Sequence, residues 1–337
     1  MFFNCSNFKK NFGEKLAFLY ELKNKNGMKV TLTNFGARIV DIFIPIDEHL
    51  RNISLSATSV EDYYQKDIYV GATVAPVAGR ISGAKTHIKG KCYHFTENEP
   101  NRTLHSGVDT SVEQYWSTEI EDKENKIIFS LFLPDGKNGF PGNVTVIATY
   151  QLTEENELKV NYQAQSDCDT IFNPTNHVYF NLTGDFQKSV ASHQLKISSQ
   201  EFVPLGKDHL PTGEILTVEG TDFDFREFAL FSKGLNRFSF QTRLVNGFDH
   251  PWLLEVGNNA VEVVSPDNKI SLIMKTNQPA VVIYTYNHGP TALAACHGAF
   301  SLECQSLPNA CNLENLGSIL LEKGKVFDSH FSYRFVF

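Results

Sequence analysis

Short apolar runs and clusters of polar turn residues succeed one another along most of this chain. The runs are rich in β-branched and aromatic residues, and the clusters that separate them include "PDGKNGFPGN", "TEENE" and "SPDN". Runs of this length and composition are typical of strands, and the separating residues are typical of turns. The pattern predicts strands within the segments 28–46, 126–133, 143–152, 157–165, 259–265, 269–276, 280–286 and 333–337.

Helical periodicity is weak throughout the chain. Short helices are predicted over Ser59–Asp67 and near Phe225–Phe231. No linker, low-complexity segment or internal repeat divides the sequence. Because many short strands bury their faces sheet on sheet, we expect an all-β fold. The expected architecture is one large antiparallel β-sandwich with few short helices, in a single domain of residues 1–337.

Composition and charge narrow the possible partners. The 337 residues are 42% apolar, which is ample for a sizeable core, and the net charge is -8. This balance offers no basic patch for nucleic acid and no attractive field for a phosphorylated substrate. The six cysteines form no Cys-x-x-Cys pair, so we interpret them as reduced thiols. Neither a signal peptide nor a membrane helix of roughly 18 apolar residues is evident, which predicts a cytoplasmic protein.

The stretch "NPTNHVYFNL", from Asn173 to Leu182, combines a strand-like pattern with unusual polar chemistry. Side chains alternate along a strand, so one face would present His177, Tyr179 and Asn181. The other face would present ordinary core residues. The polar face must therefore either meet water or line a cleft.

Four further stretches share this feature. Their candidate residues are Arg80 in "GATVAPVAGRI", His105 in "NRTLHSG", Asp249 and His250 in "NGFDHPW", and Glu303 and Gln305 in "FSLECQSLPNA". Each also has a purely structural explanation: a hydrogen-bonded histidine, a turn-forming aspartate, a surface arginine, or an edge strand with one wet face. Glu303 lies between Leu302 and Cys304, where a carboxylate should be partly desolvated. Such an environment raises a carboxylate pKa toward the range useful for a base.

If these residues converge, their chemistry suits a polyhydroxylated ligand such as a sugar. Neutral donors and acceptors would bind hydroxyls, and a histidine and a glutamate on opposite sides would act as acid and base. A second possibility is the two-histidine, one-carboxylate triad of non-haem iron enzymes, formed by His105, His177 and Glu303. That triad often includes a close His-x-Asp/Glu pair, which these residues lack.

Taken together, the motifs resemble the galactose mutarotase (aldose 1-epimerase) family over nearly the whole chain. The resemblance rests on "NPTNHVYFNL", "LHSG", "EFVPLGKDHLPTGE" followed by "TDFDFRE", "GFDHPW", "TNQPAVVIYTYN" and "FSLECQSLPNA". Any one of these motifs is weak evidence, whereas six in the family's order are specific. The resemblance implies a single-domain β-sandwich of about this length.

The resemblance also implies a reaction and a set of roles. The α and β anomers of an aldose are interconverted by opening and reclosing the ring, without a metal or organic cofactor. Glu303 matches the base, His177 matches the acid, and His105 matches a second histidine that polarises the reacting centre. The family's hydroxyl-binding residues correspond to Arg80 and Asp249. We also expect substrate contacts from Gln278, in "NQP", and from Asn176.

This sequence departs from the family pattern beside Arg80 and after His105. Ala75-Pro76 replaces a usual Gly-Arg, Gly79 replaces an Asn, and Ser106 replaces a common Gly. The expected acid and base are unaffected, but the sugar contacts around Arg80 change. A maltose or hexose-phosphate epimerase therefore remains an alternative, as does a non-catalytic carbohydrate-binding protein. We expect a small-molecule sugar as partner and a monomer or homodimer.

Overall fold

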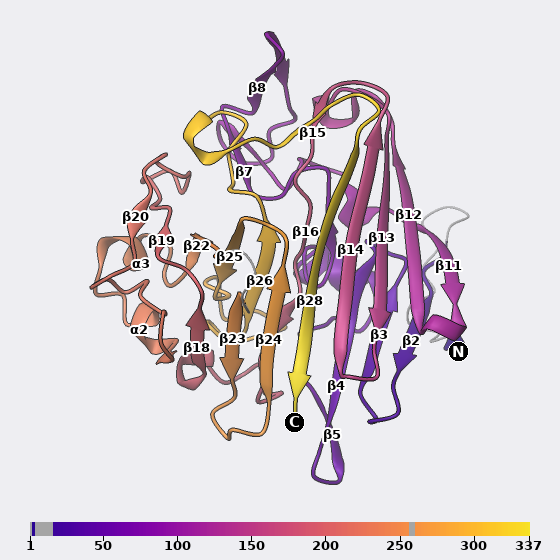
Figure 1. The fold of residues 1–337 in the computed structure, drawn as a ribbon, viewed down its shortest axis with the longest axis vertical. Helices are drawn as coiled ribbons and strands as arrows, with labels where there is room; N and C mark the ends of the chain where they lie inside the picture. The colour runs from indigo at the N-terminus through magenta and orange to yellow at the C-terminus, as the bar shows by residue number, and fades with distance from the viewer. Residues whose placement is uncertain (1, 4–15, 256–259) are drawn as a thin grey trace.

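The computed structural model describes residues 2–3, 16–255 and 260–337 of the chain. Strands make up most of it, and three large sheets stack into layers (Figure 1). Neighbouring strands are antiparallel in all three sheets. The fold is thus the all-β, antiparallel architecture that the sequence predicts.

The three large sheets have the following strand orders. The nine-stranded sheet contains β11 (Ser117–Glu121), β12 (Lys126–Leu133), β13 (Val144–Leu152), β14 (Glu157–Ser166), β28 (Val326–Val336), β24 (Ser271–Thr276), β23 (Val261–Val264), β18 (Gln194–Ile197) and β21 (Ala229–Leu230). The six-stranded sheet contains β17 (Tyr179–Phe180), β26 (Phe300–Gln305), β25 (Ala280–Tyr284), β22 (Asp249–Leu253), β19 (Glu201–Phe202) and β20 (Leu216–Thr217). The five-stranded sheet contains β1 (Phe2–Phe3), β2 (Leu19–Lys23), β3 (Lys29–Thr33), β4 (Arg38–Ile46) and β5 (His49–Asn52).

Short strand pairs complete the fold around these sheets. They are β7 (Arg80–Ser82) with β10 (Arg102–Leu104), β8 (Lys85–Ile88) with β9 (Lys91–His94), β6 (Thr73–Val74) with β16 (Thr175–Asn176), and β15 (Thr170–Ile171) with β27 (Leu320–Leu321). The α-helices of the described ranges are α1 (Val60–Lys66), α2 (Ser232–Leu235) and α3 (Phe240–Leu244). Every helix in those ranges is too short or too polar to span a bilayer.

The main core lies between the layers. One buried cluster draws side chains from all three sheets, including Ile42, Tyr150 and Leu302. The Tyr333 hydroxyl of β28 donates to the Leu302 carbonyl of β26 at 3.0 Å, which ties the nine-stranded sheet to the six-stranded one. One face of β26 is therefore committed to the core, and only its other face is free to build a site.

The predicted helix over 59–67 is confirmed, and the second predicted helix is wrong. Ser59 caps α1 by accepting the Asp62 N–H at 3.1 Å. In the segment 225–231, however, residues 229–230 form β21 and pair with β18. The Phe225 carbonyl also accepts the Ile197 N–H at 2.7 Å. Pairing with the sheet edge outweighs the weak helical pattern there.

The segment 173–182 is two strands, not the single strand expected. Residues 175–176 pair with β6 and residues 179–180 pair with β26, so the backbone changes partner at His177. The His177 N–H donates to the Ala72 carbonyl at 2.9 Å, and its own carbonyl accepts the Gly71 N–H at 2.9 Å. All ten residues are buried, so the polar side chains of this segment face protein and not bulk water.

Candidate active site

The floor of a cavity of about 280 Å³ is one face of the six-stranded sheet. Glu303 of β26 is paired with Val282 of β25, which is paired with Pro251 of β22. Asp249 and Tyr284 form the pair two positions further along β22 and β25. Directly paired residues of an antiparallel sheet point to the same side, and a step of two returns to that side. All five side chains therefore line the cavity.

The predicted alternation along 300–305 is confirmed. Glu303 and Gln305 line the cavity, whereas Leu302 and Cys304 belong to the core. Both amide atoms of the buried Gln305 side chain lack a hydrogen-bond partner within the described residues. Because an unpaired buried amide is costly, Gln305 is well suited to bind ligand hydroxyls.

Arg80 and His105 reach the cavity from the β7–β10 pair. Leu104, which precedes His105, is paired with Arg80. The Gly79 N–H donates to His105 Nδ1 at 3.2 Å, so the proton of the neutral ring lies on Nε2. Burial, with His177 and Arg80 nearby, lowers the pKa of His105 well below 6.5. His105 therefore offers the cavity a neutral N–H donor.

His177 and Glu303 are in contact at the base of the cavity. His177 Nε2 lies 3.4 Å from Glu303 Oε1, and both side chains are buried. Burial raises the pKa of Glu303 from 4.5 to about 7, although the Ser301 hydroxyl and Arg80 oppose this shift. Burial also lowers the pKa of His177 below 6.5. The two groups are therefore close enough to share a proton, and burial favours the uncharged form of each.

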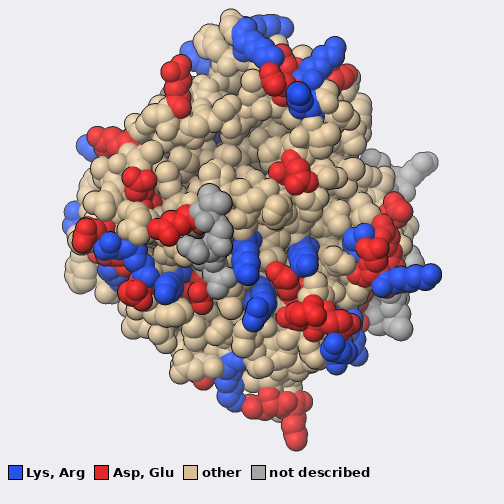
Figure 2. Space-filling model, viewed as in Figure 1, with Lys and Arg blue, Asp and Glu red and all other residues tan. Residues whose placement is uncertain are grey.

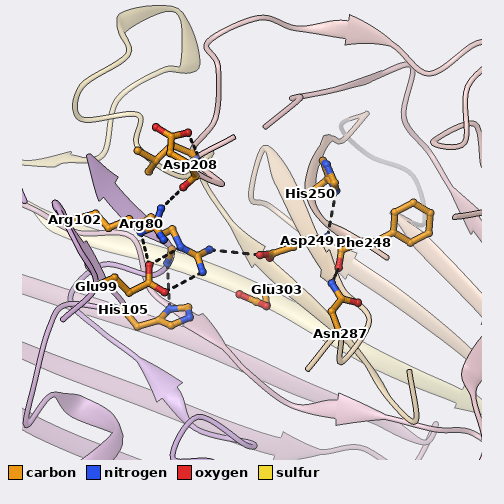
Figure 3. Close-up of polar contacts among 12 residues, drawn as sticks. Arg80, Glu99, Arg102, His105, Asp208, Phe248, Asp249, His250, Asn287 and Glu303 are labelled. Atoms are coloured by element: carbon orange, nitrogen blue, oxygen red, sulfur yellow. Dashed lines mark hydrogen bonds and ion pairs between the residues drawn. The ribbon is translucent and has the colours of Figure 1, made fainter. Parts of the chain in front are cut away.

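Ion pairs fix the direction of Arg80 above this pair (Figure 3). Arg80 Nε lies 2.8 Å from Glu99 Oε2, and Arg80 Nη1 lies 3.5 Å from Asp249 Oδ2. Glu99 is itself held by Arg102 Nε at 2.6 Å. Burial raises the pKa of Asp249 to about 6 despite the opposing effect of Arg80. The guanidinium thus links the sheet face to the β7–β10 pair.

Aromatic rings line much of the space beside the two histidines. The Tyr69 ring lies 4.7 Å from the ring of His105, and the Tyr179 ring lies 4.9 Å from the ring of His177. Tyr284 adds a third ring, 6.5 Å from that of His177. Flat apolar surfaces of this kind pack against the C–H faces of a sugar, while the polar groups bind its hydroxyls.

Two expected contact residues are not part of the cavity lining. Gln278 lies in the turn between β24 and β25, where its Nε2 donates to Asn277 Oδ1 at 3.1 Å. Asn176 is buried, and its amide donates to the Gly71 carbonyl at 3.1 Å. Its Oδ1 accepts the Val178 N–H at 3.0 Å. Asn176 therefore fixes the backbone at Val178 and at Gly71, which itself bonds to His177, without lining the cavity.

The residues that depart from the family pattern occupy different parts of the structure, and not all of them line the cavity. Gly79 lines the cavity, and a Cβ added there would lie 3.0 Å from Pro308 and 3.8 Å from Gln305 Nε2. Ala75 lies instead in the main core, and Ser106 Oγ bonds to the backbone of Val77 at 2.8 Å. The expected change in the sugar pocket thus reduces to Gly79. The prolyl residue of Ala75-Pro76 does not contribute to the lining.

Several lining residues were not anticipated from the sequence: Asp67, Tyr69, Glu99, His209, Tyr284 and His288. Asp67 ends α1, and an acidic residue at a helix C-terminus is electrostatically unfavourable. That unfavourable charge was a sequence signal that Asp67 lies in an unusual environment. The other residues lie in loops or strands whose sequence carries no comparable signal. No group of three or more His, Cys, Asp or Glu side chains in the described ranges is placed to hold a metal ion.

The fold and the site together define a class: an acid–base enzyme built on an antiparallel β-sandwich. The family model for aldose 1-epimerase matches residues 19–334. The chain belongs to the aldose 1-epimerase family, whose members are isomerases also called mutarotases.

Individual relatives agree with this assignment. Aldose 1-epimerase of Haemophilus influenzae is 32% identical over 323 residues, which cover 92% of this chain and 93% of that protein. Galactose mutarotase of Homo sapiens is 32% identical over 319 residues, covering 91% of each chain. The crystal structure of galactose 1-epimerase from Lactobacillus acidophilus has a TM-score of 0.87 to this chain at 31% identity, and covers 97% of this chain and 96% of its own.

Proposed function

We propose that this chain, as a single domain, interconverts the α and β anomers of a neutral aldohexose. The observation that carries the proposal is the 3.4 Å contact between His177 Nε2 and Glu303 Oε1 at the base of the cavity. A carboxylate with a pKa of about 7 beside a buried imidazole can give and take protons near neutral pH. The names of the relatives, aldose 1-epimerase and galactose mutarotase, support galactose as a substrate.

In the proposed reaction, Glu303 takes the proton from the C1 hydroxyl while His177 protonates the ring oxygen. The bond between C1 and the ring oxygen breaks, which leaves an open-chain aldehyde. Rotation about C1–C2 presents the other face of the carbonyl, and the ring closes with the two proton transfers reversed. His105 Nε2–H donates to the sugar oxygens, and the Arg80 and Asp249 pair orients the remaining hydroxyls.

The lining charges favour a neutral sugar over a phosphorylated one. Four carboxylates line the cavity, those of Asp67, Glu99, Asp249 and Glu303, and no lysine does. The one lining guanidinium, Arg80, is already engaged by two carboxylates. A phosphate dianion would therefore meet repulsion without a free cation to offset it. On the outer face in Figure 2, cationic and anionic side chains are likewise interspersed.

Cavity size favours a monosaccharide over maltose. A volume of about 280 Å³ lies just below the roughly 300–1,000 Å³ typical of small-molecule sites. Leu205, His209 and Pro211 also border this small cavity. We therefore expect the disaccharide to be a poorer substrate than either free hexose.

Polarimetry on freshly dissolved α-galactose, α-glucose, α-maltose and glucose 6-phosphate tests the proposal. Both free hexoses should relax to anomeric equilibrium faster with enzyme than without it, with specificity constants within about 100-fold of each other. A sugar-binding protein without catalysis would bind the hexoses in calorimetry but leave the rotation rate at its spontaneous value. Acceleration confined to the phosphate ester or the disaccharide would contradict the proposed substrate class.

A further inference from the structure

Ser301 is a buried neighbour of the carboxylate with a single specific contact. It lies two residues before Glu303 on β26, so both side chains point to the same side of the strand. Ser301 Oγ donates to Glu303 Oε1 at 2.9 Å, and Ser301 is fully buried. The same Oε1 faces His177 Nε2, whereas Oε2 makes no hydrogen bond within the described ranges. Oε2 is therefore the oxygen left to take a proton from a ligand.

Asp67 is a second carboxylate in the wall of the cavity that contains His177 and Glu303. Its Oδ1 accepts the Tyr69 N–H at 3.0 Å, and the Tyr69 ring lies 6.1 Å from the His177 ring. Asp67 forms no ion pair at contact distance with a described residue. Asp67 and His177 line the same cavity, and the negative charge of Asp67 favours the protonated form of His177.

The segment that carries Asp67 is held rigidly. The buried guanidinium of Arg38 donates to the carbonyls of Ile68 at 3.2 Å and Val70 at 2.9 Å. Arg38 also lies over the ring of Tyr63 of α1, 4.0 Å from its centroid. The guanidinium of Arg38 thus donates to backbone carbonyls and forms no ion pair with Asp67. The position of the Asp67 charge is fixed by this clamp.

Ser301 and Asp67 act on different members of the His177–Glu303 pair: Ser301 acts on Glu303, and Asp67 acts on His177. A hydrogen bond donated to Glu303 favours its ionised form, and a negative charge near His177 favours its protonated form. Burial acts the other way on both groups. We propose that Ser301 and Asp67 are positioning residues that oppose the effect of burial on this pair, Ser301 by favouring the ionised form of Glu303 and Asp67 by favouring the protonated form of His177. This inference rests on the proposed acid and base roles.

Other charged and titratable groups face the pair from every neighbouring element. Around His177 and Glu303 these are Tyr69, Arg80, His105, Tyr179, Asp249, Tyr284 and, behind β26, Tyr333. Asp249 is engaged by Arg80, and the tyrosines are neutral because burial raises their pKa values. Unlike Asp249, Asp67 has no contacting cation among the described residues: burial raises the pKa of Asp67, and Arg38 and His288 oppose this shift without forming an ion pair with it.

The proposal predicts opposite pH signatures for two variants. Ser301→Ala should lower kcat/KM about tenfold at pH 6, with the loss shrinking toward pH 9, where Glu303 ionises without help. Asp67→Asn should lower kcat/KM about fivefold at pH 9, with the loss shrinking toward pH 5, where His177 is protonated without help. The asparagine still offers an oxygen to the Tyr69 N–H, so the loop contact is kept.

Two matched controls separate these effects from general damage. Ser265→Ala removes another buried serine that donates to a carboxylate, Asp267 at 2.6 Å, away from the cavity. Glu61→Gln removes an exposed carboxylate from the same helix, α1. Each control should change kcat/KM by the same small factor at every pH. A uniform, pH-independent loss in Ser301→Ala and Asp67→Asn would overturn the proposal.

An activity-independent measurement keeps the two proposals distinguishable. The imidazole signal of His177, assigned by its loss in His177→Asn, can be titrated by NMR without sugar. At pH 7 the protonated fraction of His177 should fall in both Ser301→Ala and Asp67→Asn and stay unchanged in the two controls. An unchanged fraction overturns the positioning roles even if the enzyme is active. If the protonated fraction of His177 falls in both variants but the wild-type protein does not accelerate mutarotation, the positioning roles stand and the proposed mutarotase function is refuted.

Discussion

Glu303→Gln should abolish most activity and, at alkaline pH, make the protein more stable. The amide matches the carboxylate in shape and still accepts the Ser301 hydroxyl, but it cannot accept a proton. Turnover should fall by about 10²–10⁴-fold, the usual contribution of a positioned acid or base. Polarimetry on α-galactose measures this loss, and calorimetric titration should show that the sugar still binds.

The stability gain follows from the raised pKa of Glu303. The folded pKa is about 7 and the ordinary value is 4.5. A carboxyl whose pKa is raised on folding stabilises the protein below the unfolded pKa, and that contribution is lost as pH rises through the folded pKa. A difference of about 2.5 in pKa corresponds to about 3 kcal/mol. Removing the titration should therefore raise the unfolding free energy of the variant, relative to wild type, by about 2–3 kcal/mol between pH 5 and pH 9.

Urea denaturation at pH 5 and pH 9 measures this difference, because contacts of the amide itself contribute equally at both pH values. The control is Glu255→Gln, which removes an exposed carboxylate and should change neither activity nor the pH dependence of stability. A variant that is inactive but gains no stability at pH 9 would show that Glu303 is not desolvated in the folded state. A variant with near wild-type mutarotation would remove Glu303 from the mechanism.

Three further substitutions test the remaining roles. His177→Asn should lower turnover about 10²–10⁴-fold and flatten the alkaline side of the pH–rate profile, and an unchanged profile would exclude it as the acid. Asp249→Ala should raise KM about tenfold or more, because a charge-assisted contact to a hydroxyl is lost, and initial rates against sugar concentration measure this. Gln305→Ala should raise KM severalfold whereas Gln278→Ala should leave it unchanged, since only Gln305 lines the cavity, and equal effects would argue against the described lining.

Strand positions were the feature of the fold that the sequence predicted best. The segment 126–133 coincides with β12, and 157–165 differs from β14 by one residue. The alternation of Glu303 and Gln305 with core residues was equally readable, because a strand with one face in the core imposes period two. A helix was predicted near Phe225–Phe231, but residues 229–230 of this segment pair with the edge of β18, a strand distant in the sequence.

The residues of the candidate site also divide into those with a local sequence signal and those placed by tertiary contacts. Those within motifs, such as His177 and Arg80, were identified from their unusual local sequence. Gln278 was expected to contact the sugar, but it falls two residues before β25 and outside the cavity lining, because its position depends on where that strand begins. Asp67 and Glu99 were missed because each reaches the cavity through a loop whose path depends on tertiary contacts, such as the hydrogen bonds of Arg38.

The cavity wall has two parts of different origin, and this division limits what the departures at residues 75–79 can change. Glu303, Tyr284 and Asp249 stand on adjacent strands of one sheet whose reverse side is core, so their spacing is set by strand pairing. Gly79, Arg80 and His105 instead belong to a two-stranded excursion that touches the sheet through the Arg80–Asp249 pair. Substitutions in the excursion can therefore change sugar contacts without moving Glu303, whose position is set by the sheet. Selectivity among sugars should consequently depend on residues such as Gly79, while the proposed base is preserved on the sheet.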